Sequence, residues 1–98
     1  MQTFTCINQQ QLQQMMQQHD NLHIVDIRDP QSFNEGHIEG SIHLSNETMQ
    51  DFMAVSEFDD PVVVVCYHGI SSKQAAQYLI GLGYEDTYSL DGGFSAYS

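Results

Sequence analysis

Cys66 is the residue in this chain whose surroundings best suit it to chemistry. It follows four consecutive valines, 62–65, and precedes the segment Tyr67-His68-Gly69-Ile70-Ser71, which leads into an alanine-bearing amphipathic stretch. This pattern predicts a buried strand, a short loop and the beginning of a helix. Converging backbone N–H groups and the positive end of a helix dipole favour the thiolate form of a cysteine at such a turn. We therefore expect Cys66 to act as a nucleophile.

Two classes of enzyme use a nucleophilic cysteine in such a loop. Cysteine phosphatases follow the pattern Cys-x5-Arg, in which the arginine binds the phosphoryl oxygens in a bidentate manner. Here the sixth residue after Cys66 is Ser72, and Lys73 comes one position late and lacks the planar fork of arginine. Sulfur transfer requires less, because backbone amides alone can hold the outer sulfur of a persulfide. The sequence therefore favours sulfur chemistry over phosphoryl chemistry.

A third interpretation makes Cys66 only the last apolar residue of a core strand, since buried free cysteines are common. The loop that follows argues against this interpretation. Gly69 permits a sharp bend or a positive φ, and Ser71 and Ser72 can cap the next helix and donate hydroxyl groups to an anion. His68 stabilises the thiolate, meets the substrate, or is a solvent-facing loop residue.

Other polar residues receive structural interpretations. Cys66 and His68 have the spacing of a metal-ligand pair, but no second pair stands nearby in the sequence, so we expect neither a metal nor a cofactor. Asp26 and Arg28 alternate along the end of a predicted strand, and we expect them to form an ion pair. His37 is expected to make a structural hydrogen bond.

Strand and helix patterns alternate along the chain. Strands are predicted at 4–7, 22–27, 41–44, 62–65 and 87–90. Helices are predicted at 9–18 and 30–34, from the cap at 46 to about 55, and from the serine pair 71–72 to 82. Asn8, Asp29 and Asn46 are the expected N-caps, with Pro30 at the first helical position, and Gly83 is the expected residue just after the end of the helix that finishes at 82. The apolar stripe of the first helix is expected to consist of Leu12, Met15 and Met16. Asp91-Gly92-Gly93 is expected to be a tight turn into a last short helix. The alternation predicts one α/β domain over residues 1–98, with a mainly parallel sheet covered on both faces.

The charge balance excludes several kinds of partner. Arg28 and Lys73 are the only strong cations against 13 acidic residues, and the net charge is −11. Binding to nucleic acid or to an anionic membrane surface needs clustered cations, so neither is expected. The chain shows no secretory pattern at Met1 and no apolar run of about 18 residues, so we expect a cytoplasmic protein with free thiols. Cys6 is interpreted as a packed core residue rather than a resolving thiol.

Four motifs resemble those of the single-domain rhodaneses and follow the order of that family. They are Val25-Asp26-Ile27-Arg28-Asp29-Pro30 with Phe33, Gly36-His37-Ile38-Glu39-Gly40-Ser41-Ile42, Cys66-Tyr67-His68-Gly69-Ile70-Ser71-Ser72, and Leu90-Asp91-Gly92-Gly93-Phe94. Single motifs of this kind are weak, but four in register are specific. The resemblance covers about residues 25 to 94 and is greatest to thiosulfate sulfurtransferases. It implies an α/β fold with a five-stranded, mainly parallel sheet and helices on both faces.

The resemblance also implies a reaction and a site. Cys66 attacks the outer sulfur of thiosulfate, sulfite leaves, and a thiophilic acceptor such as cyanide takes the sulfur from the resulting persulfide. The backbone amides that cradle the persulfide are those of the substrate-binding residues Tyr67, His68, Gly69, Ile70 and Ser71. Two alternatives stay open: a relay that passes the sulfur to a protein thiol, such as a thioredoxin-like one, and a non-enzymatic binding module. The retained Cys66 disfavours the binding module.

The acidic composition predicts a salt dependence of thiosulfate use. Many rhodaneses carry arginine or lysine inside the loop, whereas this loop has neutral side chains and His68, with Lys73 just outside it. The thiosulfate dianion therefore approaches a negative protein, and added salt screens the repulsion over a Debye length of about 10 Å at 0.1 M. We expect the KM for thiosulfate, measured at constant pH, to fall as sodium chloride is raised. A clear rise in KM would contradict this account.

Overall fold

A five-stranded sheet, parallel throughout, forms the centre of the computed structural model, which describes residues 3–97. The strand order is β1-β5-β4-β2-β3, and each neighbouring pair is parallel. The strands are β1 (Thr5–Ile7), β2 (His23–Asp26), β3 (Ser41–His43), β4 (Val62–Val65) and β5 (Thr87–Leu90). The prediction of an α/β fold with a five-stranded, mainly parallel sheet is confirmed.

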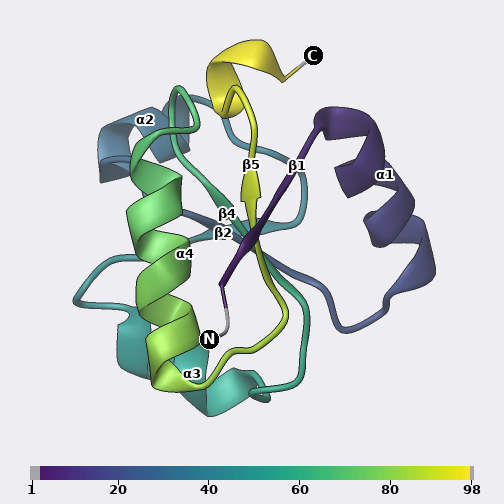
Figure 1. Cartoon of the computed structure of the whole chain (residues 1–98). Coiled ribbons are helices and arrows are strands. Elements are labelled where there is room, and N and C mark those ends of the chain that lie inside the picture. The colour runs from purple at the N-terminus through teal and green to yellow at the C-terminus, as the bar shows by residue number, and fades with distance from the viewer. Residues whose placement is uncertain (1–2, 98) are drawn as a thin grey trace.

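Helices cover both faces of the sheet, as predicted. They are α1 (Gln9–Gln18), α2 (Pro30–Glu35), α3 (Met49–Val55) and α4 (Ser71–Leu82), followed by the short 3-10 helix η1 (Phe94–Ala96). Figure 1 shows α1 on one side of the sheet, with α3 and α4 on the other. No helix within residues 3–97 is long and apolar enough to cross a membrane.

Strand β4 is the central strand, and its four valines are fully buried. Val62 and Val64 belong to the core cluster that includes residues of α3 and α4, such as Phe52 and Leu79. Val63 and Val65 belong to the cluster on the α1 side. Burial of each such apolar side chain contributes about 1.5–3 kcal/mol to the stability of the fold. Because both faces of β4 are packed, the end of the strand that precedes Cys66 is held firmly in place.

Local signals fix the helix ends that the sequence predicts. The Asn8 side chain accepts a hydrogen bond from the Gln11 N–H at 2.8 Å, and the Gln11 side-chain oxygen accepts one from the Asn8 N–H, so that α1 begins with a capping box. Asp29 caps α2, with Pro30 at its start. Gly83, at φ 123°, ends α4. These three predictions are confirmed.

The beginning of α3 differs from the prediction. The helix begins at Met49 after Thr48, so Asn46 does not cap it. The reason is a turn that precedes the helix, in which the Thr48 hydroxyl accepts from the Ser45 N–H at 2.9 Å and donates to the His43 carbonyl at 3.1 Å. This turn delays the helix by several residues.

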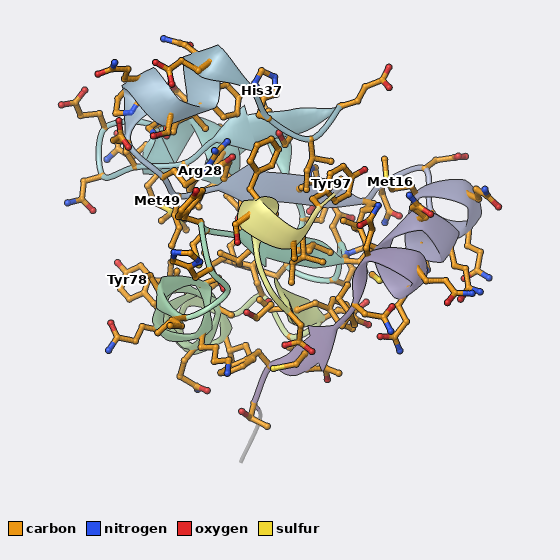
Figure 2. All side chains as sticks on the ribbon, turned by 90° about the horizontal axis from the view of Figure 1, so that it is seen from above. Met16, Arg28, His37, Met49, Tyr78 and Tyr97 are labelled. Atoms are coloured by element: carbon orange, nitrogen blue, oxygen red, sulfur yellow. The ribbon has the colours of Figure 1, made fainter. Side chains whose placement is uncertain are left out.

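Two residues expected in the core are exposed. Cys6 lies on β1, an edge strand whose only neighbour in the sheet of residues 3–97 is β5. Strand alternation turns Ile7 into the core and Cys6 to the opposite face, which is left uncovered at the edge. Met16 was expected in the apolar stripe of α1, which is centred on the buried Leu12, but it is exposed and lies near Tyr97 (Figure 2).

The Tyr88–Asp86 hydrogen bond predicts a loss of stability at high pH. The half-buried Tyr88 hydroxyl donates to the Asp86 carboxylate, and this bond, together with burial and the Asp86 charge, raises the pKa of Tyr88 to about 12. The pKa of an unfolded tyrosine is about 10, so the stabilisation is complete below pH 10 and is lost as the pH rises toward 12. We expect Tyr88→Phe to lower the free energy of unfolding by about 1 kcal/mol at pH 8. Urea unfolding should show this difference shrinking between pH 10 and pH 12; a constant difference would contradict the assignment.

Candidate active site

Cys66 lies at the point in the sheet where the chain connections diverge. Strands β2 and β4 are neighbours, but the chain passes from β2 to β3 on one side and from β4 to β5 on the other. Such a switch point, beyond the carboxyl ends of parallel strands, is where open α/β sheets bind ligands. Cys66 follows β4 directly and is 5% exposed, and Arg28 follows β2. The predicted position of the cysteine is therefore confirmed.

The Cys66 sulfur accepts hydrogen bonds from backbone N–H groups of the loop and of α4. The Gly69 N–H lies 3.0 Å from Sγ and the Ser72 N–H lies 3.3 Å from it. Ser72 is the second residue of α4, so the sulfur occupies the place of the oxygen that usually caps a helix. The N-cap residue itself, Ile70, makes no side-chain cap. The expectation that Ser71 and Ser72 cap α4 with their hydroxyls is thus replaced by capping through Cys66.

The surroundings of the sulfur favour its ionised form. Burial raises the pKa of the Cys66 thiol, but hydrogen bonds from the Ser72 hydroxyl and from the N–H groups of Ser72, Gly69 and Ile70 outweigh it, and the pKa is lowered. None of these influences comes from a charged side chain. The thiolate is stabilised by fixed dipoles, including that of α4.

Two glycines allow the loop to reach this conformation. Gly69 has φ 84°, and a Cβ there would lie 2.7 Å from the Gly92 nitrogen. Gly93 has φ 61°, and a Cβ there would lie 2.4 Å from the Cys66 carbonyl oxygen. The sequence predicted the Gly92-Gly93 turn but not its contact with the active loop. The two adjacent glycines after the last strand were the signal for a close backbone approach.

The segment after Gly93 holds the beginning of the loop by its backbone. The Phe94 N–H donates to the Cys66 carbonyl at 2.8 Å, and the Ser95 N–H donates to the Tyr67 carbonyl at 2.9 Å. The end of the described chain therefore fixes the two residues that lead into the sulfur-binding turn. These are site contacts that the sequence did not reveal.

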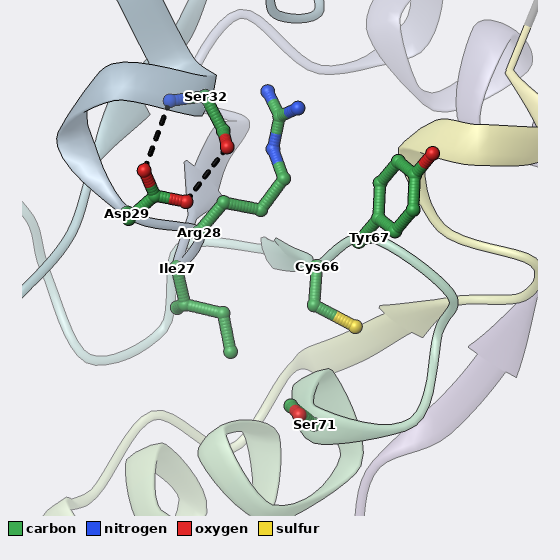
Figure 3. A pocket seen from close by; sticks show the side chains of 7 residues that line it. All are labelled: Ile27, Arg28, Asp29, Ser32, Cys66, Tyr67 and Ser71. Atoms are coloured by element: carbon green, nitrogen blue, oxygen red, sulfur yellow. Dashed lines mark hydrogen bonds between the residues drawn. The ribbon is translucent and has the colours of Figure 1, made fainter.

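A pocket of about 370 Å³ opens beside the sulfur. Its lining residues come from the β2–α2 and β4–α4 connections: Ile27, Arg28, Asp29, Ser32, Cys66, Tyr67 and Ser71. In Figure 3 the Cys66 side chain points toward Ser71 at the start of α4, while the Arg28 guanidinium lies on the other side, between Ser32 and Tyr67. A small anion has room next to the nucleophile.

The predicted loop residues divide into two groups. The side chains of Tyr67 and Ser71 line the pocket, whereas those of His68 and Ile70 are exposed and do not. His68 stacks obliquely against Tyr67, with ring centroids 4.4 Å apart, and its Nδ1 lies 3.3 Å from the Ser95 hydroxyl. His68 thus belongs to the outer surface of the loop, and any role in substrate binding falls to its backbone.

Arg28 lines the pocket, a position that its spacing from Asp26 in the sequence did not predict. Its guanidinium binds Asp26 in a bidentate manner, with the closest contact at 2.7 Å, which confirms the predicted ion pair. It also donates to the Gly36 carbonyl at 2.6 Å and lies 4.2 Å from the centre of the Phe94 ring. The same side chain therefore braces the pocket wall and places a cation, partly neutralised by Asp26, on its surface.

Two further expectations from the sequence concern His37 and a metal site. His37 Nδ1 lies 2.7 Å from the Phe33 carbonyl, and the two rings stack with centroids 3.9 Å apart, so the predicted structural hydrogen bond is confirmed. Within residues 3–97, no three His, Cys, Asp or Glu side chains are grouped so as to hold a metal ion.

Comparison with known proteins identifies the class of protein to which this fold and this cysteine-centred loop belong. The family model for the rhodanese-like domain matches residues 8–98. The chain belongs to the rhodanese family. A crystal structure of a rhodanese-like domain protein from Staphylococcus aureus superposes with a TM-score of 0.81 over 97% of this chain and 92% of that chain, at 22% identity, and so shares the fold.

Curated relatives are much more similar in sequence. Thiosulfate sulfurtransferase GlpE of Shewanella oneidensis is 53% identical over 97 residues, which cover 99% of this chain and 95% of that protein. Thiosulfate sulfurtransferase GlpE of Vibrio cholerae is 55% identical over 84 residues, which cover 86% of this chain and 79% of that protein. The resemblance to single-domain rhodaneses of the thiosulfate sulfurtransferase type is confirmed.

Gly69 and Gly40 provide a matched test of the loop geometry. Both have a positive φ, 84° and 86°, but a Cβ at Gly40 meets nothing within 4 Å, whereas at Gly69 it would strike the Gly92 backbone. We expect Gly40→Ala to cost about 1 kcal/mol of stability and to leave the Cys66 thiol pKa unchanged. Gly69→Ala should cost more and raise the thiol pKa, because the loop must shift away from Sγ. Thermal unfolding and thiolate titration check this; equal behaviour of the two variants would contradict it.

Proposed function

We propose that the protein is a thiosulfate sulfurtransferase that carries sulfur as a persulfide on Cys66. The observation that supports this most directly is a buried cysteine whose sulfur accepts two backbone N–H bonds at the mouth of a small pocket. The curated relatives are named for the same reaction. On this proposal residues 1–98 act as one rhodanese domain in the cytoplasm, where a reducing environment suits its unpaired cysteines, Cys6 and Cys66.

In the first half-reaction the Cys66 thiolate attacks the outer sulfur of thiosulfate. A bond forms between Sγ and the outer sulfur, the sulfur–sulfur bond of thiosulfate breaks, and sulfite leaves with the bonding electrons. The enzyme keeps one sulfur as a persulfide. The negative charge then resides on the terminal sulfur, and the backbone amides of the residues from Tyr67 to Ser71 are the groups that cradle it.

In the second half-reaction a thiophilic acceptor attacks the terminal sulfur. The bond between Sγ and the terminal sulfur breaks, and Cys66 leaves as the thiolate, which the same N–H groups stabilise. Cyanide is the simplest acceptor, and it gives thiocyanate. A thiol acceptor, for instance on a thioredoxin-like protein, receives the sulfur as a persulfide of its own. The two steps predict ping-pong kinetics.

Other functions fit the site less well. A phosphatase needs a bidentate clamp for phosphoryl oxygens, and the guanidinium nearest the sulfur, Arg28, is already paired with Asp26. A pure binding module has no need of a cysteine whose thiol pKa is lowered by four hydrogen-bonding groups. The relay to a protein thiol differs from thiosulfate:cyanide transfer only in the acceptor and uses the same persulfide.

The two cysteines allow a direct test of the persulfide. After incubation with thiosulfate, the intact mass of the wild-type protein should rise by one sulfur atom, and a reducing agent should remove it. Cys66→Ser should show no gain and should lower cyanide-dependent turnover by at least about a thousandfold, because the nucleophile is gone. Cys6→Ser, which removes the exposed thiol, should behave like the wild type.

Three outcomes would count against the proposal. The first is sulfur gain that follows Cys6 instead of Cys66. The second is a wild-type protein that takes up no sulfur from thiosulfate at any ionic strength. The third is turnover of phosphate esters without a sulfur adduct, which would favour the phosphatase alternative.

A further inference from the structure

Two buried serine hydroxyls lie behind the nucleophile, and the reaction described above leaves one of them without a role. Ser72 on α4 and Ser89 on β5 are both fully buried, and their Oγ atoms are 2.7 Å apart. Ser89 pairs with Val64, two residues before Cys66, on the neighbouring strand. The Ser72 N–H contacts Sγ at 3.3 Å, so the pair of hydroxyls begins next to the sulfur and extends into the sheet.

The protons of the two hydroxyl groups determine which serine donates in the hydrogen bond between them. Two hydroxyl groups carry two protons, and the contact between them uses one. Within residues 3–97 neither hydroxyl makes another hydrogen bond to oxygen or nitrogen. If Ser72 donated to Ser89, the Ser89 proton would be buried without an acceptor, which is costly. If Ser89 donates to Ser72, the Ser72 proton is free to point at the Cys66 sulfur, and both protons are used.

We propose that Ser89 is a positioning residue for sulfur transfer, which donates to the Ser72 hydroxyl and thereby directs the Ser72 proton at Cys66 Sγ. The proposal rests on the function proposed above, in which Cys66 is the nucleophile and the leaving group. The lowered pKa of the Cys66 thiol, to which the Ser72 hydroxyl contributes, agrees with this direction. Donation from Ser89 polarises the Ser72 O–H group and strengthens its bond to the thiolate.

The two half-reactions should respond differently to the loss of this hydroxyl chain. A thiol with a higher pKa is a better nucleophile once it is ionised, but it is a poorer leaving group. Loss of the Ser89 hydroxyl therefore slows persulfide formation at neutral pH, where less thiolate is present. Above the thiol pKa it does not slow persulfide formation. It slows transfer to the acceptor at every pH, because Cys66 leaves in that step. A structural defect would slow both steps at all pH values.

The other ionisable groups around the sulfur stay constant in this comparison. Arg28 and Asp29 face the pocket from the β2–α2 connection, and Tyr67 faces it from the loop itself. On α4 the nearest charged side chain in the sequence, Lys73, is exposed. On β5 the group behind the sulfur is Ser89, which does not titrate. A change at Ser89 thus alters the thiol without altering a neighbouring charge.

The first experiment titrates the thiolate by its ultraviolet absorbance in a Cys6→Ser background, where Cys66 is the remaining thiol. We expect Ser89→Ala to raise the thiol pKa by about half a unit and Ser72→Ala to raise it by about one unit. Because Ser89 acts through Ser72, the double variant should match Ser72→Ala alone. Ser89→Thr, which keeps the hydroxyl, should restore the wild-type pKa.

Ser41 supplies the matched control. It is a buried serine on β3 whose hydroxyl donates to the Ile38 carbonyl at 2.6 Å, outside the active-site pocket. Ser41→Ala removes one buried hydrogen bond as Ser89→Ala does, so thermal unfolding should show similar losses of stability. The thiol pKa and both half-reactions should be unchanged in Ser41→Ala.

The second experiment measures the two half-reactions in single turnovers, with thiosulfate and then with cyanide. Above the thiol pKa, Ser89→Ala should form the persulfide no more slowly than the wild type but should transfer its sulfur about twofold more slowly. The positioning role is overturned if Ser89→Ala leaves the pKa unchanged, if its shift adds to that of Ser72→Ala, or if Ser72→Ala has no effect. Failure of the wild type to form any persulfide would instead overturn the proposed function, while the titration would still report on the hydroxyl chain.

Discussion

The capping of α4 by the Cys66 sulfur is the interaction on which the site depends. A helix begins with N–H groups that lack partners within the helix, and a side-chain oxygen usually accepts from one of them. Here Sγ accepts from the Ser72 N–H at 3.3 Å and from the Gly69 N–H at 3.0 Å. Ionising the thiol strengthens the cap, and the cap stabilises the thiolate. The start of the helix and the reactivity of the cysteine are thus one physical feature.

The rest of the fold fixes the two partners of this cap, Cys66 and the beginning of α4, in position relative to each other. The buried valines of β4 fix the position from which Cys66 leaves the sheet, and Ala76 and Leu79 fix α4 against the same sheet. A loop of only a few residues must join them, which forces Gly69 to a positive φ. The Phe94 N–H then bonds to the Cys66 carbonyl, so the end of the described chain closes the loop from behind. A displacement of either element would break two N–H bonds to the sulfur.

Sequence patterns predicted those parts of the structure that depend on neighbours along the chain. The four valines identified a strand buried on both faces, Asp29-Pro30 identified the beginning of α2, and Cys66 followed from the strand-to-helix turn. Contacts between distant segments were not predictable in this way. The approach of Gly93 to the Cys66 carbonyl joins the last turn to the β4–α4 loop.

The order of strands in the sheet explains three further features that the sequence patterns did not predict. The exposure of Cys6 follows from the place of β1 at the sheet edge, and the hydroxyl pair behind the nucleophile follows from the position of β5 beside β4. Strand order is set by tertiary packing, and alternation along one strand does not reveal it. Arg28 illustrates the same limit: its spacing from Asp26 predicted the ion pair, but its place on the pocket wall depends on β2 lying next to β4.

The use of neutral donors around Cys66 fits the charge changes of the proposed cycle. One negative charge is present throughout, first on the thiolate and then on the terminal sulfur of the persulfide. Fixed N–H groups and hydroxyls can stabilise this single charge at both positions, which lie a short distance apart, since they need no partner ion and little reorganisation. A lysine or arginine in the loop would also bind sulfite, the dianionic product, and retard its release. The net charge of −11 acts in the opposite sense, because it weakens the attraction of thiosulfate and favours the departure of sulfite. In this protein the weaker binding of thiosulfate and the easier release of sulfite have the same electrostatic origin.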